Sequence, residues 1–150
     1  MNNKQLPRNW RNCNPLNIKR TAGDKWKGLK EHCTDKTFCE FKSMRYGWRA
    51  AFMILGKYYS KYGLQSIGAI IARFAPAAEN NVVGYAEWVA GMMGVDRRQP
   101  LPPPQDAPDT WKRLAFLMAI YEGGVPTVEQ LAHVRPWELE QGWQEYIERL

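Results

Sequence analysis

The sequence predicts a mainly α-helical (α+β) fold with one small β-hairpin lobe near residues 24–42. Beyond residue 43, apolar residues recur at helical spacing, and glycine or proline interrupts the pattern between successive helices. Residues 37–41 instead alternate apolar and polar side chains, as in a half-buried strand, and residues 25–29 offer a pairing partner across the intervening turn. The rest of the first 42 residues is expected to form loops.

The helices are predicted from their apolar residues and their end signals. Ser43 is expected to cap a helix over about residues 44–62, whose apolar side chains form one stripe and which Gly63 ends. The two helices that follow, each with the residue that ends it, are expected over about residues 65–74 (Pro76) and 81–93 (Gly94).

The fourth predicted helix, over about residues 110–122, is apolar on almost every side. Such a helix is usually central and buried. Asp109 is expected to cap its beginning. A short helix near residues 127–132 and a last one from Pro136 complete the predicted order.

The length and the linker composition predict one domain. A chain of 150 residues is long enough to bury about two thirds of its unfolded surface, so residues 1–150 are expected to form one unit. The Pro-rich segment 99–108 is a semi-rigid connection within it. No apolar run is long enough to cross a bilayer, and the first residues lack the apolar segment of a signal peptide. We expect synthesis in the cytoplasm, with any export by a route outside general secretion.

The charge balance favours an anionic partner. The net charge is +6, from 21 Lys and Arg against 15 Asp and Glu, and the cations concentrate before residue 62. A cell-wall polymer, an acidic protein face or a nucleic acid would suit this charge. Because Lys and Arg are not densely clustered, nucleic acid is the least favoured of the three. The aromatic content of 13% exceeds what the core needs and suits surfaces that stack on sugars or partner proteins.

The cysteines and histidines give little support for a metal site. Cys33 and Cys39 flank the turn of the predicted hairpin, although free thiols are the default in a cytosolic protein. The two histidines, His32 and His133, lie far apart in the sequence. No glycine-rich phosphate-binding loop is present. We therefore expect neither a metal nor a cofactor.

Residues 12–19, with the sequence Asn-Cys-Asn-Pro-Leu-Asn-Ile-Lys, are typical of an ordered polar loop. Asn and Pro belong to turns, because an Asn side chain bonds nearby backbone and Pro fixes φ. Leu16 and Ile18 are then apolar anchors. Loops of this kind often line functional sites. The alternative is an N-terminal turn that binds nothing.

Glu122 is the first candidate for a catalytic residue. It falls on the last turn of the predicted buried helix, where the negative end of the helix macrodipole and partial burial both favour a protonated carboxyl group. A protonated Glu is what a general acid for glycoside cleavage needs. The alternative is an exposed Glu that merely precedes a glycine at a helix end.

Glu79 is the second candidate, in a connection between helices. It either caps the helix that follows or lines a cleft and holds substrate or water. Glycosidases usually pair the acid with a second carboxylate, which Glu79, Asp24, Asp35 or Glu40 can supply. Sequence spacing alone does not rank them.

Several segments follow one another in a recognisable order. They are Asn14-Pro15-Leu16-Asn17-Ile18-Lys19, Trp26-Lys27-Gly28, Phe38 to Ser43, Tyr46 to Ala50, Ile70 to Asn80, and Tyr85. This order resembles a family of phage- and prophage-encoded proteins that are often labelled virion or structural proteins. Members carry an Asn-Pro-Gly/Leu-Asn-Ile-Arg segment early and Ala-Pro-x-x-Glu-Asn later.

The same order is similar to the later part of lysozyme-like glucosaminidases. There the catalytic Glu ends a helix that precedes the asparagine turn, whereas only about a dozen residues precede it here. Ala119-Ile120-Tyr121-Glu122-Gly123-Gly124 is similar to the missing helix end. The resemblance implies a circularly permuted lysozyme-like domain. In it Glu122 and Glu79 are the catalytic residues, and the substrate-binding residues are Asn14, Asn17, Ile18, Trp26, Asn80 and Tyr85.

The resemblance implies an enzyme that cleaves the glycan strand of peptidoglycan, as a muramidase, a glucosaminidase or a lytic transglycosylase. Its partners would be the glycan strands and other phage virion proteins, and it would be associated with the virion. The alternative is a non-catalytic virion structural protein or a cell-wall-binding protein on the same scaffold.

Overall fold

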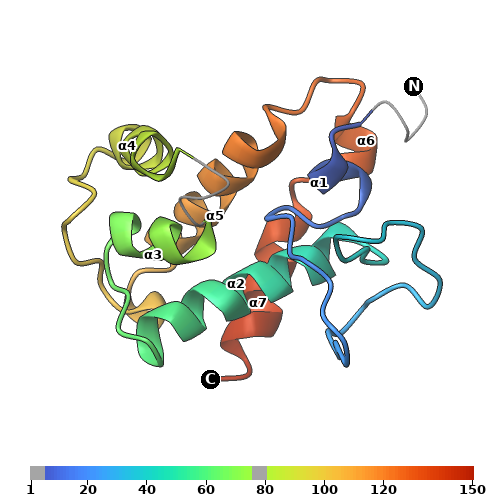
Figure 1. The fold of residues 1–150 in the computed structure, drawn as a ribbon, viewed down its shortest axis with the longest axis horizontal. Coiled ribbons are helices and arrows are strands. Elements are labelled where there is room, and N and C mark those ends of the chain that lie inside the picture. Colours follow the sequence, from blue (N-terminus) through green and yellow to red (C-terminus); the bar gives the residue numbers. More distant parts are fainter. Residues whose placement is uncertain (1–5, 76–80) are drawn as a thin grey trace. The chain divides into compact units, whose positions relative to one another are not determined.

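A computed structural model describes residues 6–75 and 81–150 (Figure 1). The structure confirms the mainly α-helical class. The described helices, in chain order, are α1 (Arg8–Arg11), α2 (Met44–Ser60), α3 (Ile67–Phe74), α4 (Val82–Met93), the 3₁₀ helix η2 (Pro104–Asp106), α5 (Pro108–Gly123), α6 (Leu131–Val134) and α7 (Glu138–Ile147). No described helix has the length and apolar character needed to span a membrane.

The chain forms two compact units. Unit 1 contains residues 1–53 and 118–150, and unit 2 contains residues 54–117. Unit 1 therefore joins the two ends of the sequence in one body, which no local sequence pattern indicates. The helices α2 and α5 each contribute residues to both units.

The core of unit 1 is a cluster of aromatic rings. Trp10, Trp48 and Phe52 form a continuous series, with successive ring centroids 6.4 Å apart. Trp143 of α7 meets Phe52 edge to face at 4.9 Å. Tyr146 completes the cluster at 5.3 Å from Trp143. Rings in these arrangements contribute beyond the area they bury, so these aromatic contacts help to join α2 and α7.

The structure does not confirm the predicted β hairpin as a regular element. Over the described residues of this region the structure has only two isolated antiparallel bridges, Lys19 with Phe38 and Leu29 with Phe41. The physical reason is that side chains take the backbone groups that a ladder would use. Asp35 accepts the N–H groups of Thr37 and Phe38, each at 2.9 Å. Short polar side chains compete with strand pairing in this way, and the lobe is a folded loop.

Unit 2 is built from the last part of α2, α3, α4, η2 and the first part of α5. The ends of α3 and α4 follow the sequence signals. The Ser66 and Asn81 side chains accept from the N–H groups of Ala69 and Gly84, as N-caps do. Gly94 ends α4 in the left-handed conformation, with φ +71°. In the core, the fully buried Trp111 meets Tyr59 edge to face at 5.4 Å.

Several helices differ from the prediction. The short helix α1 was not expected, because four residues are too few to show a helical repeat. The fourth helix begins at Pro108, so Asp109 lies in its first turn and is not the cap. The last helix begins at Glu138 rather than Pro136. Proline suits the first position of a helix, as at Pro108, because a residue there has no helical partner for its N–H group, so proline loses no hydrogen bond by lacking one.

The Pro-rich connection is held by unit 2. Trp111 Nε1 donates to the Pro102 carbonyl at 2.9 Å, and the Leu101 N–H donates to the Gln65 carbonyl at 2.7 Å. The connection therefore has a fixed path over its described length.

Candidate functional site

Asn14 sets the shape of the loop at residues 12–19, which we call the asparagine loop. Its Oδ1 accepts the Ile18 N–H at 2.9 Å, and its Nδ2 donates to the Ile18 and Cys39 carbonyls, each at 3.0 Å. The Asn14 side chain is fully buried, as is Leu16. Asn14 therefore holds the loop from inside, and Leu16 and Ile18 anchor it as expected.

Two residues of the asparagine loop have the left-handed backbone conformation without being glycine. Cys13 has φ +51° and Asn17 has φ +52°. Such residues are uncommon and are maintained only where surrounding contacts determine them. At Asn17 the conformation directs the side chain to α5, where its Nδ2 donates to Glu122 Oε1 at 3.2 Å.

The C-terminal end of α5 is fixed against α1 and the asparagine loop. Asn9 is fully buried, and its Nδ2 donates to the carbonyls of Pro15 at 3.0 Å and Ala119 at 3.1 Å. Trp10 Nε1 donates to the Gly124 carbonyl at 3.0 Å. These two side chains thus bond backbone carbonyls on either side of the last turn of α5. Glu122 is thereby held, half-buried, beside the asparagine loop.

Two glycines make close contacts around the asparagine loop. Gly28 has φ +81°, and a Cβ there would lie 2.1 Å from the Tyr46 ring. A Cβ at Gly47 would lie 2.0 Å from the Cys13 carbonyl oxygen. Glycine is the only residue that fits where backbone and ring come so close. The segment around Gly28 thus packs against Tyr46, and Gly47 packs against the asparagine loop at Cys13.

The sequence candidates fall into three groups. Asn14, Asn17, Ile18 and Glu122 come together in unit 1, and Trp26 lines a separate pocket of that unit. Tyr85 is fully buried on α4 in unit 2, so its side chain belongs to that core. Glu79 and Asn80 lie outside the described residues.

The carboxylates near the asparagine loop mostly accept hydrogen bonds from other groups of the protein. Asp35 accepts a bidentate pair of hydrogen bonds from Arg8, at 2.7 and 3.2 Å. It also accepts one hydrogen bond from the Asn12 side chain, at 2.9 Å. Burial raises the pKa of Asp35, but the bonds from the Phe38 N–H and from Arg8 outweigh it and hold the pKa well below its ordinary value. Asp35 is therefore an ionised structural group.

Glu40 and Asp24 also bond their own loop. The buried Glu40 accepts from the N–H and the hydroxyl of Thr34, at 2.9 and 3.0 Å. Asp24 accepts from the Thr21 N–H at 2.7 Å, and the bonds from Thr21 lower its pKa against the opposing effect of burial. Of these two, Asp24 is the more exposed and borders a pocket.

Among the described residues, no three His, Cys, Asp or Glu side chains are grouped so as to hold a metal. Cys13, Cys33 and Cys39 are all free thiols.

The sequence reasoning missed Asn9, Trp10 and His133. His133 Nε2 lies 3.0 Å from the Trp10 carbonyl oxygen, which ties α6 to α1. A Trp beside an Asn shortly after Pro7 is a weak helix-start signal, and it is the one feature of the sequence that points to this segment.

Fold and site define a mainly helical protein in which a helix-end carboxylate is held against an asparagine-rich loop. No family model matches the chain. The chain is 48% identical over 99 residues to Protein P5 of Pseudoalteromonas phage PM2. The match covers 65% of this chain and 62% of the phage protein, so the chain corresponds to less than two thirds of that relative. The chain is thus phage-related.

Proposed function

We propose that this phage-related chain cleaves the glycan strand of peptidoglycan, with Glu122 as the general acid. The observation that supports the proposal most directly is the hydrogen bond from Asn17 to Glu122, at 3.2 Å between residues 105 positions apart. This bond holds the asparagine loop against the C-terminal end of α5. A glycan-cleaving site on a lysozyme-like scaffold would need these two segments side by side.

Under this proposal, the order of the catalytic helix and the asparagine loop along the chain is a circular permutation of their order in lysozyme-like glucosaminidases. In the glucosaminidases that the sequence resembles, the helix with the catalytic Glu precedes the asparagine turn. Here α5 follows the asparagine loop in sequence but ends beside it in space. The contacts of Asn9 with both Pro15 and Ala119 support the same arrangement.

The proposed chemistry begins with proton transfer. Glu122 gives its proton to the glycosidic oxygen, the bond from the anomeric carbon to that oxygen breaks, and the electron pair leaves with the oxygen. Water then adds to the sugar cation to give a hydrolysed product, or a hydroxyl of the same sugar adds to give an anhydro sugar. In either case the adding O–H group gives its proton to the Glu122 carboxylate, which restores the acid. Asp35 and Glu40 are held in hydrogen bonds that shape the loops, and Glu79 is the proposed second carboxylate.

Glu122→Gln tests the proposal on purified peptidoglycan, with clearing measured in a gel and as loss of turbidity. A general acid contributes about 10²- to 10⁴-fold, so clearing should fall by that order. A glutamine oxygen still accepts the bond from Asn17, so the unfolding free energy should change little. Glu129→Gln, which alters an exposed Glu of unit 1, is the matched control and should clear normally. Clearing by Glu122→Gln at the native rate would remove Glu122 from the mechanism.

The second candidate function is a non-catalytic virion structural or wall-binding protein on the same scaffold. It is favoured by the relation to a phage protein and by the commitment of Asp35 and Glu40 to loop structure. The proposed partners are then peptidoglycan and other virion proteins. Co-sedimentation of folded native protein with peptidoglycan, without any clearing, would decide for this candidate.

A further inference from the structure

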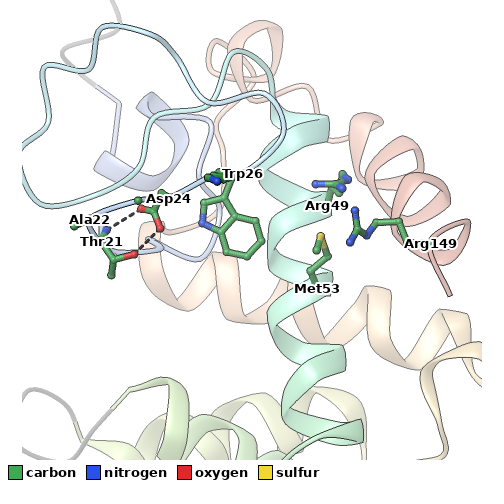
Figure 2. Close-up of a pocket in the computed structure, with 9 residues that line it drawn as sticks. Thr21, Ala22, Asp24, Trp26, Arg49, Met53 and Arg149 are labelled. Atoms are coloured by element: carbon green, nitrogen blue, oxygen red, sulfur yellow. Dashed lines mark hydrogen bonds between the residues drawn. The ribbon is translucent and has the colours of Figure 1, made fainter.

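A pocket of unit 1 away from the Asn17–Glu122 contact carries an excess of positive charge. Its volume is about 380 Å³. Figure 2 shows several of its lining residues, with Trp26 from the loop and Arg49 and Met53 from α2. The lining residues are Thr21, Ala22, Gly23, Asp24, Lys25, Trp26, Arg49, Met53 and Arg149. Three of these side chains are cationic and one is anionic. We call it the Arg49 pocket.

Arg49 is a buried cation whose guanidinium group has no hydrogen-bond partner among the residues that the structure describes. Its exposed fraction is 7%, and no hydrogen bond or ion pair joins its guanidinium group to the part of the chain that the structure describes. Burying a charge without a partner is costly. Burial lowers the pKa of Arg49, and the nearby charge of Arg149 lowers it further. An anion bound at the Arg49 guanidinium group would therefore stabilise this buried charge.

Arg149 adds a second guanidinium group to the same pocket. Figure 2 shows its side chain directed toward Arg49. Two guanidinium groups of like charge repel each other, and an anion between them would relieve this repulsion. Planar guanidinium groups bind carboxylate and phosphate through paired N–H bonds.

The carboxylates around the pocket do not neutralise this pair. Glu145 is the nearby acid that raises the pKa of Arg49, yet its oxygens lie against other cations, Lys27 at 3.0 Å and Arg45 at 3.9 Å. Asp24 accepts from Thr21 and stays at the pocket wall. Its charge disfavours a doubly charged phosphate more than a singly charged carboxylate, and its oxygens can still accept an amide N–H.

Trp26 and Met53 give the pocket an apolar wall. The half-buried Trp26 presents a large ring surface, on which the apolar face of a sugar can stack. The lining thus combines two guanidinium groups, one carboxylate acceptor and one aromatic ring. These groups fit a ligand that has a carboxylate, an amide and a sugar ring.

We propose that the Arg49 pocket binds the carboxylate-bearing peptide end of a muramyl peptide, with Arg49 and Arg149 on the carboxylate and Trp26 on the sugar. The inference rests on the proposed function, because it names the part of peptidoglycan that the chain holds apart from the bond it cleaves. The pocket recognises the acid group of the stem peptide and so orients the glycan strand.

Calorimetric titration of the native chain with N-acetylmuramyl-L-alanyl-D-isoglutamine, which carries one carboxylate, tests the pocket. Arg149→Gln changes an exposed side chain and should weaken binding at least tenfold without loss of folding. Arg49→Lys keeps the charge but loses the planar fork, and should weaken binding similarly. Arg98→Gln, an exposed arginine of unit 2, is the control and should bind normally.

Two further ligands decide which chemistry the pocket recognises. The same muramyl peptide with its carboxylate converted to an amide should bind at least tenfold more weakly. Equal binding of the amide, or no measurable binding of the acid, overturns the proposal. Inorganic phosphate that displaces the peptide at lower concentration than the peptide itself would show a phosphate site and overturn it as well.

The two proposals fail separately. Glu122→Gln should bind the muramyl peptide as the native chain does. Binding by a native chain that never clears peptidoglycan overturns the glycan-cleaving function and leaves the pocket intact. Clearing by a native chain that does not bind the peptide overturns the pocket alone.

Discussion

Gly123 lies directly against the side chain of Asn9, so close that a Cβ atom at position 123 would be 1.8 Å from Asn9 Oδ1. This contact brings the end of α5 and the short helix α1 together. It explains why the residue after Glu122 is glycine in terms of packing, without reference to the site. Any larger residue would push α5 away from α1.

Gly123→Ala should therefore destabilise the chain. Overpacking at a rigid contact costs about 1–3 kcal/mol of unfolding free energy. Gly91→Ala is the matched control, because Gly91 is a helical glycine of α4 with nothing within 4 Å of an added Cβ. That change should be neutral or stabilise by roughly 0.5–1 kcal/mol. Urea unfolding of both variants measures the difference, and equal stability would contradict the packing argument.

Asn14→Ala should be more destabilising than the loss of an ordinary helix cap. It removes three hydrogen bonds and leaves buried backbone groups without partners, each worth about 1–3 kcal/mol. Asn81→Ala, which removes one N-cap bond of α4, should cost about 1 kcal/mol. Chemical denaturation compares the two. A smaller effect at Asn14 than at Asn81 would show that the loop does not depend on the Asn14 amide.

The Asn17 amide should matter for activity more than for stability. Asn17→Gly keeps the left-handed backbone without strain but removes the donor to Glu122. Losing one positioning bond should lower clearing of peptidoglycan by about tenfold, which corresponds to roughly 1.4 kcal/mol. Asn17→Ala should show the same loss plus about 1–2 kcal/mol of backbone strain. Full clearing by folded Asn17→Gly would exclude this positioning role.

Asp35 should make the chain sensitive to acid. Its folded-state pKa lies below the unfolded value of about 3.9, so its stabilisation is present above that value and is lost as the pH falls toward the folded one. Asp35→Asn should be less stable at neutral pH and lose less stability between neutral and acidic pH. Asp106→Asn, at an exposed site, should follow the native curve. Parallel curves for Asp35→Asn and native protein would refute the linkage.

Thiol labelling should separate the three cysteines. Burial raises the pKa of Cys13 to about 11 and that of Cys39 to about 12, so neither forms much thiolate at pH 8. Cys33 is the more exposed thiol and should react first. A thiol reagent at pH 8 should modify one cysteine in native protein and three in denaturant. Rapid labelling of all three in the native state would contradict the burial of Cys13 and Cys39.

Local patterns predicted the long helices well. The apolar stripe of α2 was visible because this helix is long enough to repeat its apolar positions several times. The helix α5 was visible because it is apolar on almost every side. Ser66 and Asn81 act at helix starts, as short polar residues do. The hairpin was not confirmed as a regular element. Alternation of apolar residues does not reveal that Asp35 accepts backbone N–H groups that a strand pair would use.

The sequence by itself determined the helical class and the presence of an ordered asparagine loop. Those features depend on residues close together in the chain, where periodicity and turn chemistry act. Only the tertiary structure decided that Asn17 meets Glu122 and that Arg49 shares a pocket with Arg149. Such contacts join segments about 100 residues apart, and they arise from packing of distant faces, which leaves no local repeat in the sequence.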